Sequence, residues 1–176
     1  ELRPKIDAML APILDSVSSD EPIEIMANLA IPFPVAVISA LLGVEDDQPP
    51  EFPGLIRDLT SFIDAAADAA ARERAGEAAI AIAEFFVALV ERKRTTPDDG
   101  LLSALIEVEA EGDRLNLEEL IANTSLLYAA GFETTSNLIG NGLWALLRNP
   151  DQLELLRSDR SLLGSAVMEI LRYDSP

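Results

Sequence analysis

The chain has 176 residues, of which 49% are hydrophobic, and its formal net charge is −18 at pH 7. So acidic a chain cannot neutralise phosphates, which excludes nucleic acid as a partner and disfavours binding to anionic membrane surfaces. The sequence contains no cysteine and no histidine, which excludes a disulfide framework.

The first third of the chain predicts short helices separated by prolines. No secretory signal opens it, and its longest apolar run, residues 29–44, is broken by prolines, so we expect a cytoplasmic protein without a membrane span. Apolar residues at helical spacing predict a helix over residues 2–17, followed by an extended piece over residues 23–29. A second helix is expected to begin at Pro32 and to end at Gly43.

The middle third predicts three more helices, over residues 51–67, 72–94 and 101–108. We expect Thr96-Pro97-Asp98 to cap the last of them, with proline at its first position. The cluster Glu91-Arg92-Lys93-Arg94 places cations at the negative end of the preceding helix dipole.

Residues 117–148 predict one long central helix. Asn116 is a good N-cap, and Glu119 stands where the second partner of a capping box is expected. Apolar residues on several faces indicate a buried helix, about 48 Å long, which other helices must surround. Two short helices over residues 150–156 and 163–173 complete the prediction. The expected fold class is all-α, a multi-helix bundle around this helix, with residues 1–176 forming a single domain.

The centre of this helix departs from ordinary helix composition, with the run Ala130-Gly131-Phe132-Glu133-Thr134-Thr135. Glycine in a helix interior costs about 1 kcal/mol relative to alanine, and a threonine that bonds back to the preceding turn bends or loosens the helix. Two interpretations remain open. The run is either a small-residue notch where another helix crosses, or a functional site at an opened turn.

The run A-G-F-E-T-T resembles the distal-helix signature of the haem-thiolate monooxygenases, the cytochrome P450 family, of the soluble bacterial type. Two later stretches are also similar to that family, L-R-N-P-D-Q-L after the central helix and M-E-I-L-R-Y-D-S-P at the end of the chain. The sequence holds four E-x-x-R spacings, but only Glu169 to Arg172 is followed by Tyr173 and Pro176. The resemblance is clear from about residue 98 onward.

The resemblance implies roles for the central residues. Ala130 and Gly131 would flank the groove in which dioxygen sits at a haem. Thr134 would hydrogen-bond the bound oxygen and help to deliver protons for O–O cleavage, and Glu133 would supply that relay from solvent as the acid of an acid–alcohol pair. Thr135 would have a structural role, bonding back to the helix.

Further roles follow from the same resemblance. Leu126 and Ala129 would face the substrate pocket, and Glu169 and Arg172 would form a structural ion pair rather than a catalytic one. The parent enzyme would insert one oxygen atom into a small apolar substrate, with electrons from a ferredoxin or a flavoprotein reductase.

Family chemistry requires a cysteine thiolate on the haem iron, and this sequence has no cysteine. We therefore expect the central segment of a cytochrome P450, truncated at both ends, that binds no metal, does not ligate haem through thiolate and is inactive alone. The alternative is a haem-free all-α interaction domain. Loss of the surrounding segments would expose Leu126, Ala130 and Phe132, so we expect the isolated chain to self-associate.

Overall fold

The computed structural model describes residues 2–17, 21–44, 49–61, 68–110 and 115–176, and these form helices joined by turns and loops, with no strand among them. The α-helices are α1 (Arg3–Asp15), α2 (Pro32–Leu42), α3 (Phe52–Thr60), α4 (Ala69–Thr95), α5 (Leu101–Ala110), α6 (Leu117–Arg148), α7 (Pro150–Ser158) and α8 (Leu163–Tyr173). A π-helical turn, η1 (Met26–Ala30), precedes α2, and a 3-10 turn, η3 (Arg160–Leu162), precedes α8. The all-α prediction is confirmed.

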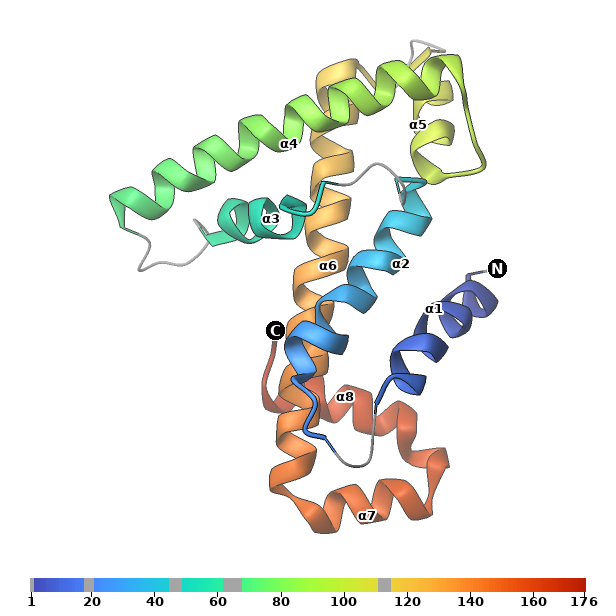
Figure 1. Ribbon diagram of the computed structural model, residues 1–176, viewed down its shortest axis with the longest axis vertical. Coiled ribbons are helices and arrows are strands. Elements are labelled where there is room, and N and C mark those ends of the chain that lie inside the picture. Colours follow the sequence, from blue (N-terminus) through green and yellow to red (C-terminus); the bar gives the residue numbers. More distant parts are fainter. Residues whose placement is uncertain (1, 18–20, 45–48, 62–67, 111–114) are drawn as a thin grey trace.

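Helix α6 is the axis of the molecule (Figure 1). Its 32 residues begin at the predicted capping box, in which the Asn116 side chain accepts from the Glu119 backbone N–H and the Glu119 side chain accepts from the Asn116 N–H. In Figure 1, α4 crosses α6 near its N-terminal end, α2 runs beside its middle, and α7 and α8 fold back at its C-terminal end.

The hydrophobic core lies at the end of α6 that α3 and α4 cover. Phe52 of α3, Phe86 of α4 and Tyr128 of α6 are fully buried there. Their rings meet edge to face, with centroids 5.0 Å apart for Phe52 and Tyr128 and 5.8 Å apart for Phe52 and Phe86. Aromatic pairs of this geometry favour each other beyond the area that they bury. The core therefore fixes the N-terminal half of α6 more firmly than its C-terminal half.

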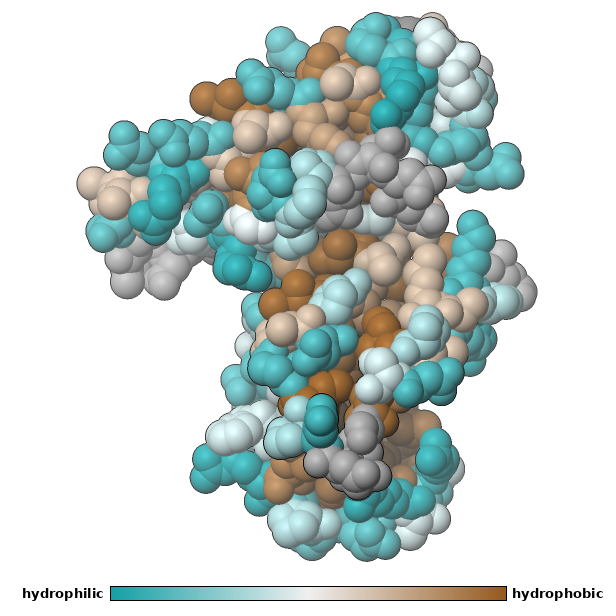
Figure 2. All heavy atoms as spheres, viewed as in Figure 1, coloured by the Kyte–Doolittle hydropathy of each residue, from teal (hydrophilic) through white to brown (hydrophobic). Residues whose placement is uncertain are grey.

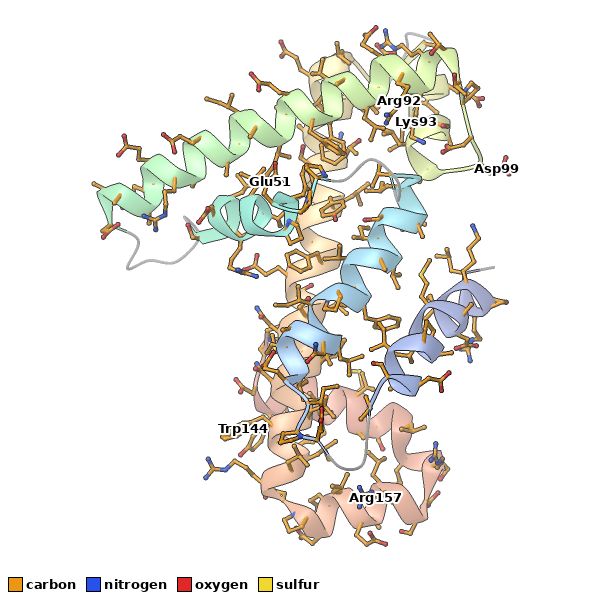
Figure 3. The ribbon with its side chains drawn as sticks, viewed as in Figure 1. Glu51, Arg92, Lys93, Asp99, Trp144 and Arg157 are labelled. Atoms are coloured by element: carbon orange, nitrogen blue, oxygen red, sulfur yellow. The ribbon has the colours of Figure 1, made fainter. Side chains whose placement is uncertain are left out.

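Burial of α6 is one-sided, which corrects the prediction of a helix buried nearly all round. Phe132, expected to be exposed, is only 2% exposed, whereas Leu126, Trp144 and Leu147 are each more than 60% exposed. Trp144 lies on the outer side of α6 (Figure 3), where the Arg148 guanidinium stands 5.3 Å from its ring centroid. The apolar pattern of α6 thus exceeds what the described part of the chain covers.

Two smaller predictions were wrong. The segment around Met26–Ala30, expected to be extended, is a π-helical turn that leads directly into α2. Pro97 is not the first residue of a helix, because α5 begins at Leu101, after a loop that Asp98 organises. Sequence patterns located the helices well but did not predict the conformation of these two connecting segments.

A buried charge joins the end of α4 to the start of α5. Lys93, near the end of α4, is 5% exposed, and its ammonium donates to the Asp98 carboxylate. Asp98 also accepts from the Ser103 hydroxyl at 2.7 Å and from the Gly100 N–H at 3.1 Å. Lys93 lies in the last turn of α4, as expected, and is in addition the buried partner of an ion pair. Figure 3 shows it on the side of α4 that faces α5.

Burial and hydrogen bonding act in opposite directions on Asp98. Partial burial raises its pKa, but hydrogen bonds from Lys93, Ser103 and Gly100, with the charge of Lys93, outweigh this and lower the pKa to about 2. Gly43, with φ of +74°, ends α2 beside this carboxylate. A side chain there would adopt a rarely populated backbone conformation and would collide with Asp98, so glycine is required.

Across the described ranges, no helix combines the length and the apolar character that crossing a bilayer needs.

Candidate oxygen-side face of the central helix

An exposed stripe runs along the middle of α6. Leu126 is 65% exposed, and Ala130 and Thr134, each four residues further along, are exposed as well. Residues at this spacing lie on one face of a helix. Glu133 is half-buried beside the stripe, and Ala129 is buried in the core at 7% exposure. The stripe is therefore small in side-chain volume at Ala130 and Thr134, and apolar at Leu126.

The hydroxyl of Thr134 bonds back along the helix. Its Oγ1 donates to the Ala130 carbonyl oxygen at 2.7 Å. The sequence predicted this kind of bond at Thr135, and the structure shows it at Thr134. Helix α6 is continuous from Leu117 to Arg148, so the expected opening of a turn at this point is not present.

Three other hydroxyl groups of α6 make the same bond. Those of Thr124, Ser125 and Ser136 donate to carbonyl oxygens four residues earlier, at 2.8 to 2.9 Å. Thr124 and Ser136 are buried, so the bond satisfies a polar group that has no access to water. Thr134 differs from them because its hydroxyl is on the exposed stripe and can exchange its partner for one outside the helix.

Gly131 has a packing role. A Cβ at Gly131 would stand 2.8 Å from the Cδ1 atom and 3.1 Å from the Cγ1 atom of Ile38 on α2. Both distances are shorter than ordinary carbon contacts. The crossing of two helices at a small-residue notch, one of the two interpretations left open by the sequence, is thus realised at Gly131.

The ion pair Glu169–Arg172 is formed as expected. The guanidinium donates to both carboxylate oxygens, at 2.8 and 2.6 Å, and both side chains are exposed on α8. The hydrogen bonds from Arg172 lower the pKa of Glu169, and those to Glu169 raise the pKa of Arg172. The pair lies on α8, away from the Thr134 stripe on α6.

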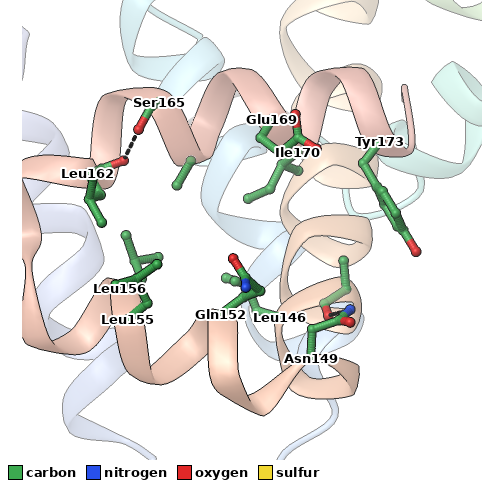
Figure 4. Close-up of a pocket in the computed structure, with 12 residues that line it drawn as sticks. Leu146, Asn149, Gln152, Leu155, Leu156, Leu162, Ser165, Glu169, Ile170 and Tyr173 are labelled. Carbon is green, nitrogen blue, oxygen red and sulfur yellow. Dashed lines mark hydrogen bonds between the residues drawn. The ribbon is translucent and has the colours of Figure 1, made fainter.

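A cleft lies at the other end of α6, between α7 and α8 (Figure 4). Its volume is about 560 Å³, and its lining includes Leu146, Leu155, Leu156, Ile170 and Tyr173. The α6 residue nearest to Thr134 in that lining is Ala145, eleven positions further on, which is roughly 16 Å along the axis. The cleft is therefore separate from the stripe.

An apolar groove of about 380 Å³ lies between α1, α2, α6 and α8. Figure 2 shows hydrophobic surface in this lower half of the molecule, rimmed by hydrophilic residues. Both the cleft and the groove are bordered by α8, and none of the residues of α8 is buried. Helix α8 is therefore only partly covered by the rest of the described chain.

Comparison with known proteins identifies the family that the A-G-F-E-T-T run and the E-x-x-R helix resemble. The family model for cytochrome P450 matches residues 57–171, which includes the whole of α6. This chain belongs to the cytochrome P450 family. The resemblance noted on A-G-F-E-T-T and on the E-x-x-R helix is thereby confirmed.

Similar cytochrome P450 proteins match along nearly the entire chain. Cytochrome P450 107B1 of Saccharopolyspora erythraea is 43% identical over 99% of this chain and 42% of its own length. Vitamin D(3) 25-hydroxylase of Pseudonocardia autotrophica is 43% identical over 100% of this chain and 42% of its own length. The solved structure of CYP164A2 from Mycobacterium smegmatis has a TM-score of 0.91 at 36% identity, covering 98% of this chain and 45% of that one. The chain thus spans less than half the length of these relatives.

The residues present fit only part of a haem site. The exposed stripe, with small side chains at Ala130 and Thr134, would accept a flat apolar group against α6. No residue of the 176 can supply a thiolate or an imidazole to iron, because the sequence has no cysteine and no histidine. The described residues also hold no cluster of three carboxylates that could bind a metal ion. A thiolate of the kind that the family uses would come from outside this sequence.

The sequence did not reveal the residues that hold α6 in place. The hydroxyls of Tyr128 on α6 and Ser39 on α2 lie 3.3 Å apart, and both side chains are buried. A tyrosine within an apolar helix signals that its hydroxyl needs a partner. That partner stands 89 positions earlier in the chain, and only the tertiary structure identifies it.

Proposed function

We propose that this sequence is the central part of a longer bacterial cytochrome P450, which inserts one oxygen atom of O2 into a small apolar substrate with electrons from a ferredoxin or a reductase. The identity to such proteins along 99% of the chain supports this, as does the order of the two motifs. The chain spans 42% of those relatives, so the haem ligand and the surface for the electron donor would lie outside it.

Haem, when bound, supplies the oxygen activation. The contribution of this chain is the wall on the oxygen side. Ala130 would leave room against α6, whereas the space at Gly131 is filled by Ile38 of α2. Leu126, exposed one turn earlier, would be part of the substrate pocket. Ala129, which is buried, would support that wall from behind rather than line it.

The proton step belongs to Thr134 and Glu133. The Thr134 hydroxyl now donates to the Ala130 carbonyl oxygen at 2.7 Å. Donation toward the haem side would require the hydroxyl to leave that carbonyl, which costs about 1 kcal/mol for an ordinary hydrogen bond. Glu133 stands next to Thr134 in the helix and is partly open to water, so its carboxyl group would return the proton to Oγ1 from solvent.

A single observation carries this proposal: the hydroxyl of Thr134 is exposed on the stripe, while those of Thr124 and Ser136 are buried and that of Ser125 is half-buried. The test uses the haem-loaded longer protein, supplied with electrons by a ferredoxin and its reductase. Thr134→Ala should raise the hydrogen peroxide released per reduced nicotinamide consumed, because protons no longer reach the oxygen side. Thr135→Ala is the matched control and should leave this ratio unchanged. Equal ratios for wild type and Thr134→Ala would refute the role.

For the 176 residues alone, we propose that no thiolate-ligated haem forms and that the chain is inactive. The supporting observation is the absence of cysteine and histidine from the sequence, which also favours the second candidate, a haem-free helical interaction domain. Adding haem to the purified chain, reducing it and adding carbon monoxide separates the possibilities. The red-shifted Soret band of a thiolate complex would show that a ligand had been overlooked.

We also propose that the isolated chain self-associates. Several large apolar side chains of α6 and α8 are exposed, namely Leu126, Leu127, Trp144, Leu147, Val167, Met168 and Tyr173. Apolar surface of this kind drives association when no other partner covers it. Sedimentation velocity over a range of concentrations should show dimers or larger species. A monomer at the highest concentration would contradict the proposal.

A further inference from the structure

Two neighbouring residues of α2, Ile38 and Ser39, touch α6 at different points. Ile38 fills the notch at Gly131, and the Ser39 hydroxyl meets the Tyr128 hydroxyl at 3.3 Å. Ile38, Ser39 and Tyr128 are buried, at 7%, 3% and 0% exposure. One contact restricts how close α6 may come to α2, and the other joins polar groups that have been removed from water.

Tyr128 connects α6 to more than α2. Its ring packs edge to face on Phe52 of α3, with centroids 5.0 Å apart, and lies 6.4 Å from the ring of Phe86 on α4. With the ring held between α3 and α4, the direction of the hydroxyl is fixed as well. Rotation of α6 about its own axis would therefore change both the contact with Ser39 and the packing of the Tyr128 ring.

Thr134 is close to these contacts along the helix but points elsewhere. It stands three positions after Gly131, which places it about 60° around the axis, and six positions after Tyr128, about 120° around. The hydrogen bond of its hydroxyl is made within α6, to the Ala130 carbonyl oxygen, and not to α2. Its position therefore depends on the rotational setting of the whole helix at Tyr128 and Gly131.

We propose that α2 sets the rotation of α6 through two contacts, Ser39 with Tyr128 and Ile38 with Gly131, and that these are positioning residues for the Thr134 hydroxyl. The functional meaning of this inference rests on the proposed function, whereas its geometric content concerns the 176-residue chain alone. A Cβ at Gly131 would need Ile38 or α6 to move by about 0.6 Å to reach ordinary contact.

The first experiment follows the threonine methyl resonances by NMR in the full 176-residue chain. Gly131→Ala should shift the Thr134 methyl resonance and weaken protection of the amides near it from exchange. Gly76→Ala is the matched control, because a Cβ at Gly76 on α4 meets nothing within 4 Å. It should leave the Thr134 resonance in place.

Two further variants keep the proposal testable if Gly131→Ala does not fold. Tyr128→Phe retains the ring and removes only the hydroxyl, and it should also shift the Thr134 resonance. In the double variant Ile38→Val/Gly131→Ala, one methyl group is removed where another is added, and the resonance should return toward its wild-type position. An unmoved Thr134 resonance in both Gly131→Ala and Tyr128→Phe would overturn the inference.

The second experiment uses the haem-loaded longer protein and measures the hydrogen peroxide released per reduced nicotinamide consumed, called here the peroxide ratio. Gly131→Ala should raise this ratio, but it should add nothing to the ratio of Thr134→Ala, because both changes act through one hydroxyl. Additive effects would show that Gly131 acts by another route. If Thr134→Ala itself changes nothing, the proposed function fails while the NMR result still decides the positioning. If only Thr134→Ala raises the ratio, the positioning inference alone is overturned.

Discussion

Replacement of Asp98 by asparagine should destabilise the chain, because it removes a charge and very little volume. The Lys93 side chain is 6% exposed and the Asp98 side chain is 46% exposed. Breaking a buried pair costs about 3–5 kcal/mol, whereas an exposed pair contributes about 0–1 kcal/mol. A pair with one buried and one half-exposed member lies between these limits, so we expect a loss of about 2 kcal/mol at pH 7.

The pKa of Asp98 gives an independent measure of the same quantity. Its lowering from 3.8 to about 2 corresponds to roughly 2.4 kcal/mol, which solvent screening of the half-exposed carboxylate reduces to about 1–2 kcal/mol. Because the folded-state pKa lies below the ordinary value, this stability is fully present above pH 4 and is lost as the pH falls to about 2. The difference between wild type and Asp98→Asn should therefore close across that interval.

Urea denaturation of the 176-residue chain, followed by circular dichroism, measures both effects. Asp99→Asn is the matched control, since it makes the same change at the adjacent, exposed position and should alter stability by no more than about 0.5 kcal/mol. Equal midpoints for wild type and Asp98→Asn at pH 7 would refute the reasoning. So would a difference that persists unchanged at pH 2.

Three further changes test the fold. Asn116→Ala should cost about 1 kcal/mol through loss of the capping box, while Asn123→Ala, exposed within α6, should cost nothing; equal urea midpoints would contradict this. Phe86→Ala should cost about 3–5 kcal/mol, and a loss below 1 kcal/mol would show that the aromatic core is not formed. Glu169→Gln should leave the Tm of the isolated chain unchanged, because its ion pair is exposed, and a clear drop in Tm would indicate an unseen contact.

Local sequence signals predicted much of the fold. The capping box at Asn116 and Glu119 places the start of α6, and the terminal helix was predicted at residues 163–173, as found. Such features depend on neighbours within a few positions, which the sequence displays directly. The π-helical turn at Met26–Ala30 could not be predicted this way, because its apolar residues fit an extended piece equally well.

Features that depend on distant partners were not predictable. Lys93 looks like one of several surface cations at the end of a helix, and only the arrival of Asp98 from the next loop explains its burial. Helix α6 carries apolar residues on several faces, but the described elements cover one of them. Helix α6 therefore has more apolar surface than the described residues cover. This agrees with relatives that are more than twice as long as this chain.

The candidate site was predicted in composition but not in conformation. The run from Ala130 to Thr135 was identified from its residues alone, and it does combine a helix crossing at Gly131 with an exposed hydroxyl at Thr134. The expected opening of the helix was wrong. A glycine costs little when it admits a neighbouring side chain, and a threonine can bond back without breaking the helix.

The central claim is that a haem lies against the exposed stripe of α6 in the longer protein. The most direct measurement is the crystal structure of that protein with haem bound, in which the iron is located by its anomalous scattering. We predict that the haem plane covers the face of α6 that carries Ala130 and Thr134, with the thiolate arriving from residues outside this sequence. A haem bound instead in the cleft between α7 and α8, or out of contact with α6, would contradict the account.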